Sequence, residues 1–211
     1  MKKFELTNEF VTNMFGTKLF RIRALVEFGD VEAGELGGYV EKESNLGHDD
    51  NAWVYDNAWV YGNARVYGDA QVSGDARVYD NAWVYGDAQV YGNARVYGNA
   101  RVYGNAWVYG NAWVYGNAWV YGNALVCSDE DYAYAHGFGS VNRTTTFFRL
   151  KDGGVGVRCG CFYGTLAQFR DKIRETHGET KKAQEYLMLA DLMELRFEED
   201  ENEVGNRKYV E

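Results

Sequence analysis

The sequence of 211 residues contains no proline, only three cysteines, and no apolar run that approaches the length needed to cross a membrane. The first residues, Met1 to Thr7, lack the apolar core that a signal peptide requires. Without a secretion signal, the cysteines are expected to be reduced thiols in a cytoplasm. We therefore expect a cytoplasmic location and no membrane partner.

The sequence also lacks an excess of cationic residues, since 22 Lys and Arg stand against 31 Asp and Glu and the net charge is −9. Nucleic-acid binding needs clustered cations, so a nucleic-acid partner is not expected. Residues 51–128 hold four Arg and five Asp, and this near neutrality argues against an acidic DNA mimic. The acidic run from Glu198 to Glu203 is typical of a solvated helix end or tail.

The main feature that is present is a six-residue unit, Ala-Xaa-Val-Tyr-Gly-Asn with small variations, repeated thirteen times between Ala52 and Val126. An Ala precedes each Val by two positions. A strict period of six with this pair predicts a parallel β-helix. The Gly-Asn, Gly-Asp and Asp-Asn pairs that end the units suit the left-handed backbone of corners. The valines are Val54, Val60, Val66, Val72, Val78, Val84, Val90, Val96, Val102, Val108, Val114, Val120 and Val126.

Residues two apart in a strand point the same way, so Ala and Val should fill the interior while the residue after each points outward. The unit resembles the hexapeptide repeat of left-handed β-helix proteins, which implies three units per coil. Residues 18 apart would then stack at a spacing of about 4.8 Å. The outward position between Ala and Val holds every Trp of the chain, so Trp and Arg should stack in columns with cation–π contacts. Two such columns read Arg65, Trp83, Arg101, Trp119 and Trp59, Arg77, Arg95, Trp113. Tyr follows Val in eleven of the thirteen units and should form ladders that stabilise the stacked strands.

The predicted fold class is an all-β solenoid, a left-handed parallel β-helix, with a β-rich N-terminal cap and a small α+β C-terminal cap. The expected domains are residues 1–50, 51–128 and 129–211. Short strands with a turn near Gly16 are expected over residues 4–26, and the first irregular coil should begin near Leu36. In the C-terminal cap we expect a hairpin of residues 144–150 and 155–163, then two helices, over residues 165–177 and 181–197.

The helix predicted from Lys181 to Phe197 carries two apolar stripes. One stripe should pack in the core of the cap, and the other leaves a surface for a partner. The partner favoured by this pattern is a second copy of the chain, so a homo-oligomer through this helix is expected.

The polar clusters outside the repeat do not predict a metal site or a catalytic site. The corner that holds His48, Asp49 and Asp50 is interpreted as an exposed polar corner rather than a metal or acid–base site. Cys159 and Cys161 continue a valine stripe and are expected to be buried thiols, because zinc would favour a Cys-x-x-Cys spacing with two further ligands. No metal, cofactor or catalytic residue is predicted.

Several segments outside the repeat resemble a family of phage and prophage hexapeptide-repeat proteins, and the similarity covers nearly the whole chain. The resemblance implies a phage origin and a host cytoplasm, but it brings no activity with it. The segments that carry it are residues 21–30, 36–46, 144–152, 159–162 and 176–178.

Two functions follow from these observations. The first is a non-enzymatic binding or scaffold protein that acts on a host protein or small ligand, such as an inhibitor of a defence system, because contiguous exposed aromatic area marks interfaces. The alternative is an acyltransferase that uses acyl-CoA or acyl carrier protein. Similar enzymes rely on a general-base His at the edge of the coils and usually on an inserted loop, and the repeat contains neither. The partner is expected to contact the flank near the C-terminal coils, where three Trp lie beside two Arg. The predicted binding residues are Trp83, Arg95, Arg101, Trp107, Trp113 and Trp119.

Overall fold

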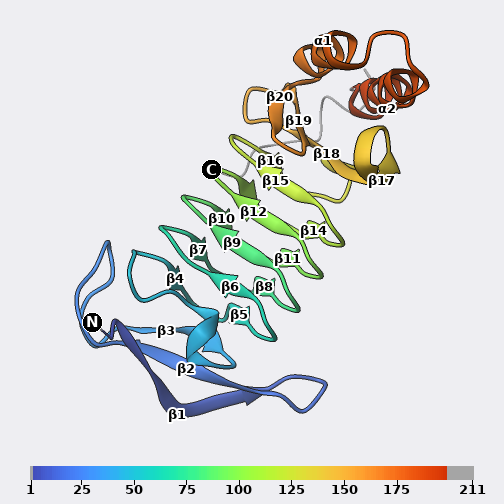
Figure 1. Cartoon of the computed structure of the whole chain (residues 1–211). Helices are drawn as coiled ribbons and strands as arrows, with labels where there is room; N and C mark the ends of the chain where they lie inside the picture. The colour runs from blue at the N-terminus through green and yellow to red at the C-terminus, as the bar shows by residue number, and fades with distance from the viewer. Residues whose placement is uncertain (1, 199–211) are drawn as a thin grey trace.

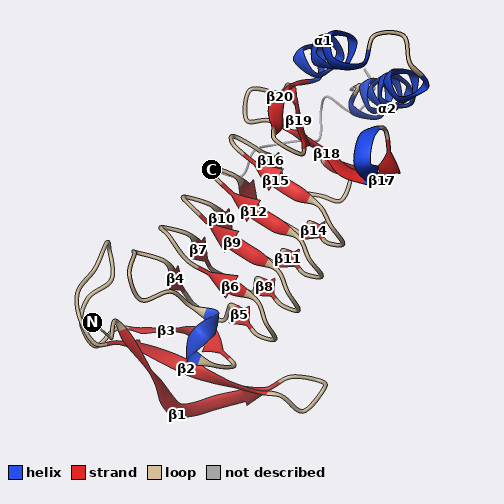
Figure 2. Cartoon of the chain, in the orientation of Figure 1, coloured by secondary structure: helices blue, strands red, loops and turns tan. Residues whose placement is uncertain are grey.

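A computed structural model describes residues 2–198 of the chain (Figure 1). The molecule is elongated, with a coil of short parallel strands between two caps. An antiparallel hairpin lies at the N-terminal end, and a small sheet with two helices lies at the other end (Figure 2). The predicted fold class, a β-solenoid with a β cap and an α+β cap, is confirmed. The left-handed sense of the coil and the exact domain boundaries stay predictions.

The N-terminal cap extends one face of the coil. Strands β1 (Phe4–Thr12) and β2 (Lys18–Ala24) form an antiparallel hairpin, as expected. Strand β3 (Leu36–Val40) pairs antiparallel with β2 on one side and parallel with β5 on the other. A short 3-10 helix, η1 (Glu43–Asn45), then leads into the regular repeat. The cap therefore continues the hydrogen-bonded sheet without a break.

The coil makes about five turns and has three faces. Face 1 consists of β3 followed by β5 (Trp59–Val60), β8 (Arg77–Val78), β11 (Arg95–Val96) and β14 (Trp113–Val114). Face 2 consists of β6 (Arg65–Val66), β9 (Trp83–Tyr85), β12 (Arg101–Tyr103) and β15 (Trp119–Tyr121). Face 3 consists of β4 (Trp53–Val54), β7 (Gln71–Val72), β10 (Gln89–Val90), β13 (Trp107–Val108) and β16 (Leu125–Val126).

The interior of the coil is built from the repeated Ala and Val, as predicted. Every one of these side chains from Ala52 to Val126 is fully buried. Strands of neighbouring turns pair in register at a separation of 18 residues, for example Val90 with Val72 and with Val108. Each valine therefore packs against its equivalents above and below.

The corners explain why glycine recurs in most of the units. The corner Gly68 has φ of 72°, and a Cβ there would lie 2.9 Å from the backbone nitrogen of Gly86 in the next turn. A side chain is excluded by both the backbone conformation and the close approach of the turns. Asp56 and Asp80 adopt the same positive φ at two corners, and each carboxylate accepts a hydrogen bond from the N–H of the glycine one turn later. Asn ladders such as Asn63, Asn81, Asn99 and Asn117 join the other corner positions.

The C-terminal cap begins with a four-stranded antiparallel sheet of β17 (Tyr132–Phe138), β18 (Arg143–Arg149), β19 (Val155–Cys159) and β20 (Phe162–Thr165), with the short helix η2 (Ser140–Asn142) between β17 and β18. The predicted second strand, residues 155–163, is two strands, because the chain turns at Gly160, where φ is 60°. Cys161 lies in this turn and is exposed, and Cys159 is half-buried. The expectation of two buried thiols was therefore wrong.

Both predicted helices are present, as α1 (Leu166–His177) and α2 (Lys181–Phe197). The side-chain oxygen of Thr165 accepts a hydrogen bond from the N–H of Gln168, and Gly178 ends α1. Helix α2 packs Ala183, Ala190 and Met193 into the cap, as its first stripe predicts. None of the helices in residues 2–198 is long and apolar enough to cross a membrane. The acidic run mostly lies outside the described residues, which end at position 198.

Candidate binding surface

The outward position between Ala and Val forms one column of side chains on each face. Sheet pairing sets Arg95 beside Arg77 and Trp113 on face 1, and Arg101 beside Trp83 and Trp119 on face 2. These are the columns predicted from the period of six and the three units per coil that the resemblance implies. The column of face 3 consists of Trp53, Gln71, Gln89, Trp107 and Leu125.

The column of face 2 alternates cation and indole. The guanidinium carbon of Arg101 lies 4.9 Å from the ring centre of Trp83 and 4.8 Å from that of Trp119. Arg158 from β19 continues the alternation, since its guanidinium carbon lies 5.5 Å from the ring of Trp119. Its Nε also donates a hydrogen bond to the hydroxyl of Tyr103, at 3.0 Å. The C-terminal cap thus docks on the end of this column.

Both ends of the column on face 3 are also contacted by the caps. Trp53 is 0% exposed, because Phe4 and Phe28 pack edge-on against its ring with ring centres 6.2 and 5.3 Å away. At the other end, the ammonium of Lys151 lies 3.8 Å from the ring centre of Trp107. The expectation that all six Trp are exposed was therefore wrong for Trp53, which belongs to the core of the N-terminal cap.

At the C-terminal end of the column of face 1, the side chain of Trp113 is exposed. Trp113 is 41% exposed, and the guanidinium carbon of Arg95 lies 4.7 Å from its ring centre. The hydrogen bonds from the cap reach the backbone of Trp113: Asp129 accepts from its N–H at 2.6 Å, and the hydroxyl of Tyr132 donates to its carbonyl at 2.7 Å. The indole ring itself stays available to a partner.

A ladder of tyrosines runs beside this column on face 1. Successive rings stack with centres 4.9 to 5.3 Å apart, and Tyr115 at the end is 40% exposed. Burial in the stack, followed by the neighbouring phenols, raises the pKa of Tyr79 to about 12. The phenol is therefore protonated at neutral pH and can donate a hydrogen bond. The ladder comprises Tyr61, Tyr79, Tyr97 and Tyr115.

The structure divides the six predicted binding residues among the three faces. Arg95 and Trp113 lie together on face 1, Trp83, Arg101 and Trp119 lie on face 2, and Trp107 lies on face 3. Arg158 and Lys151 of the cap contact Trp119 and Trp107, although Trp107 is still 37% exposed. Trp113 is 41% exposed and is contacted by Arg95 of its own column, so Arg95 with Trp113 is the open combination of an arginine and an indole. Face 1 adds Trp59 and Arg77, which the sequence places in the same column but which were not among the predicted binding residues.

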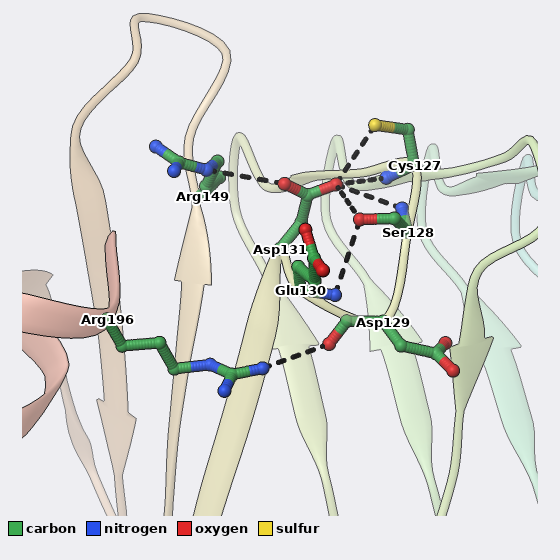
Figure 3. A network of polar contacts seen from close by, with 7 residues as sticks. All are labelled: Cys127, Ser128, Asp129, Glu130, Asp131, Arg149 and Arg196. Atoms are coloured by element: carbon green, nitrogen blue, oxygen red, sulfur yellow. Dashed lines mark hydrogen bonds and ion pairs between the residues drawn. The ribbon is translucent and has the colours of Figure 1, made fainter. Parts of the chain in front are cut away.

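A polar network at the C-terminal end of the coil was not predicted (Figure 3). Asp131 is 1% exposed, and its Oδ2 accepts hydrogen bonds from the backbone N–H groups of Cys127 and Ser128, at 3.0 and 2.9 Å. Its Oδ1 lies 3.3 Å from Nε of Arg149 in β18. Nearby, the N–H of Trp119 donates to the hydroxyl of Thr146. These side chains satisfy backbone groups of the last turn that no further turn can pair.

The histidines take part in contacts of the caps. The ring of His48 stacks on Phe4 with centres 4.4 Å apart, and its Nε2 lies 3.0 Å from a carboxylate oxygen of Glu43. The imidazole of His48 is 28% exposed and joins β1 to the first corner, so the prediction of a merely exposed corner missed this contact. Within residues 2–198, no group of three His, Cys, Asp or Glu side chains is placed to hold a metal ion.

Comparison with known proteins concerns the coil alone. Six stretches match the model of the YdcK β-solenoid repeat, residues 58–70, 70–86, 88–102, 94–110, 100–116 and 106–122. No curated protein matches the chain. The matched stretches are the turns whose Ala and Val fill the interior, so the match and the geometry agree. In its repeats, the chain is similar to the YdcK β-solenoid repeat family, and this similarity concerns the fold.

Proposed function

We propose that the chain is a phage-encoded, non-enzymatic binding protein that acts in the cytoplasm of a host cell. It would bind a host protein or small ligand through face 1, and inhibition of a defence system is the role that this setting favours. The observation that carries the proposal is the exposed indole of Trp113 beside the guanidinium of Arg95, on the column whose end the cap leaves open. Large aromatics and arginine are the residues enriched in binding hot spots.

Binding is favoured over acyl transfer by the placement of the three histidines. His48 lies at the N-terminal cap, and His136 and His177 belong to the C-terminal cap. None of them lies between the coils, where a general base of a hexapeptide-type transferase would stand. The most direct experiment is a pull-down from host lysate, followed by mass spectrometry of the captured proteins and small molecules.

Trp113→Ala tests this surface once a partner has been captured. We expect the variant to weaken binding by about 2 kcal/mol or more, roughly thirtyfold in the dissociation constant, because an exposed indole at an interface buries a large apolar area. The melting temperature should change little, since the ring points away from the core. Affinity and melting temperature are measured on the same preparation.

Trp119→Ala is the matched control, because it removes an indole from the same turn but from face 2. Its ring packs on Arg101 and Arg158, so this variant should lower the melting temperature more than Trp113→Ala and affect binding less. If Trp113→Ala lowered the melting temperature and left the affinity unchanged, the column would be structural and the proposed surface would be wrong.

We further propose that a second copy of the chain binds to helix α2. Met188, Leu192 and Leu195 form its second apolar stripe and are 71%, 54% and 67% exposed. Their spacing of four and three residues is the spacing by which two like helices form a seam. An antiparallel pair would set Leu192 against Leu195 of the other copy. The flanking Asp191 and Arg196 are already engaged within the chain, by an ion pair with Arg170 and a hydrogen bond to the carbonyl of Asp129.

Leu192→Glu should shift the chain from dimer to monomer at high micromolar concentration, because it places a carboxylate in the centre of the seam. Light scattering measures the mass directly. Lys182→Ala changes the net charge by the same amount at another exposed position of α2, and it should leave the dimer intact. A parent protein that is strictly monomeric at this concentration would contradict the proposal.

A further inference from the structure

The column of face 1 contains an unusual pair of neighbouring cations. Arg77 and Arg95 lie directly beside each other in adjacent strands. Face 2, in contrast, separates its arginines by Trp83, and face 3 has no charge in its column. Like charges directly opposite each other across a sheet are destabilising. In the columns of faces 1 and 2, this pair is the one place in the repeat of residues 52–126 where two arginines are neighbours.

The two guanidinium groups pack in opposite directions. Arg77 lies against Trp59, with its guanidinium carbon 4.4 Å from the ring centre, and Arg95 lies against Trp113 at 4.7 Å. Each arginine therefore contacts the indole on the side away from the other arginine. Arg101 on face 2 contacts the indoles on both of its sides. The arrangement on face 1 leaves the position between the two guanidinium groups unfilled by an aromatic ring.

No carboxylate in residues 2–198 compensates these two charges. Within the described residues, the guanidinium groups of Arg77 and Arg95 make cation–π contacts and neither has an ion pair or a hydrogen bond to another side chain. Two carboxylates on this side of the coil are engaged elsewhere: Asp80 accepts from the N–H of Gly98, and Asp129 accepts from the N–H of Trp113. Both arginines are half-buried, so solvent screens their repulsion only in part.

The side chains next to the pair are hydrogen-bond donors and aromatic surfaces. Tyr79 and Tyr97 lie in the same two turns of the coil as Arg77 and Arg95, and their rings stack with parallel planes and centres 4.9 Å apart. Exposed Trp113 and Tyr115 lie one turn further along. Guanidinium groups donate hydrogen bonds in a planar fork that matches an oxyanion, and flat indole and phenol rings accept a planar group by stacking.

We infer that the Arg77–Arg95 pair binds the oxyanion of a small anionic molecule, with each guanidinium donating to a different oxygen. A planar part of the same molecule extends over Arg95 and contacts the exposed edge of Trp113, because Arg95 already covers the face of the indole. This inference rests on the proposed function, because it assigns a ligand class to the same face. The anion neutralises the repulsion that the alternating columns avoid. The ligand class is a small molecule that joins a phosphate or similar oxyanion to a ring.

The test measures the thermal unfolding midpoint of the full chain in increasing inorganic phosphate, with chloride added to keep the ionic strength constant. A ligand that binds the folded state raises the midpoint as its concentration increases. We expect a rise with phosphate, and a rise at lower concentration with phenyl phosphate, because the ring adds contact with the exposed edge of Trp113. Trp113→Ala should remove the advantage of phenyl phosphate while leaving the effect of inorganic phosphate.

Glutamine substitutions provide matched variants, because Gln71 and Gln89 already occupy the equivalent outward position on face 3. Arg77→Gln and Arg95→Gln should each weaken phosphate binding at least tenfold, and Arg101→Gln on face 2 should bind as the parent does. Without phosphate, Arg77→Gln should lower the midpoint less than Arg101→Gln, since it relieves repulsion and loses contact with one indole instead of two. No rise in the parent, or equal binding by Arg95→Gln and the parent, would overturn the inference.

The outcomes separate this inference from the proposed function. If phosphate has no effect but Trp113→Ala still weakens a captured partner, only the anion site is wrong. If phosphate binds to the arginine pair but Trp113→Ala leaves the affinity for the captured partner unchanged, the anion site stands and the proposed partner surface is wrong.

Discussion

Replacing Val90 with aspartate is expected to destabilise the coil by about 3–5 kcal/mol, the cost of an unpaired charge in a protein interior. The side chain of Val90 is fully buried between Val72 and Val108. The interior around it is lined by Ala and Val, so a carboxylate would find neither a cation nor a hydrogen-bond donor. Because folded proteins are typically stable by about 5–15 kcal/mol, this loss is a large part of the total.

The neighbouring residue Gln89 provides the control. Gln89→Asp puts the same charge in the same strand, but the outward position keeps the carboxylate in contact with water. It should therefore change the midpoint of denaturant unfolding far less than Val90→Asp. A midpoint for Val90→Asp that equals the midpoint of the parent would show that the repeated valines do not fill the interior.

Removing the carboxylate of Asp131 should be similarly costly. Asp131→Ala takes the acceptor from the N–H groups of Cys127 and Ser128 and the ion pair from Arg149, in a site where the carboxylate is almost completely buried. Breaking a buried pair by removing one partner typically costs about 3–5 kcal/mol. The effect should concentrate at the end of the coil, where the network joins the last turn to β18 (Figure 3).

Hydrogen exchange locates this effect. In Asp131→Ala, the amides of β15 and β16 should lose protection before those of β7 and β10, because the opening begins at the C-terminal end. Glu130→Ala is the control, since Glu130 is exposed and lies next to the network. Unchanged stability and exchange in Asp131→Ala would mean that the carboxylate does not hold the cap to the coil.

The coil could be predicted from the sequence because each of its contacts recurs at one spacing. The burial of every repeated Val follows from the period. The position of Arg101 between Trp83 and Trp119 and the tyrosine ladders follow from the period together with the three units per coil that the resemblance to hexapeptide-repeat proteins implies. The helices of the cap were also predictable, because Thr165, Gly178 and the apolar stripes are local signals. Local and periodic signals need no knowledge of how distant segments meet.

The contacts of the caps could not be predicted in this way. Nothing in the period indicates that Phe4 and Phe28 cover Trp53, or that Arg158 approaches Trp119. These contacts join segments of irregular sequence across long separations in the chain. The buried role of Asp131 could not be predicted either, because an acidic residue in a loop is usually solvated. Only the fold shows that its carboxylate accepts hydrogen bonds from backbone N–H groups of the last turn. The candidate binding surface therefore differs from the predicted one, because contacts with the caps determine which Trp side chains remain exposed.

The pairing of each turn only with its neighbours has a consequence for synthesis of the chain. The N-terminal cap leaves the ribosome before the coil and provides an edge, β3, to which β5 adds in parallel. Every later unit then finds its partner 18 residues earlier, so the coil can grow in step with translation. Until Asp131 and Thr146 arrive, the growing end presents unpaired N–H groups to any other strand. A chain that stopped before residue 129 would keep that open end and would be prone to add further copies into fibres.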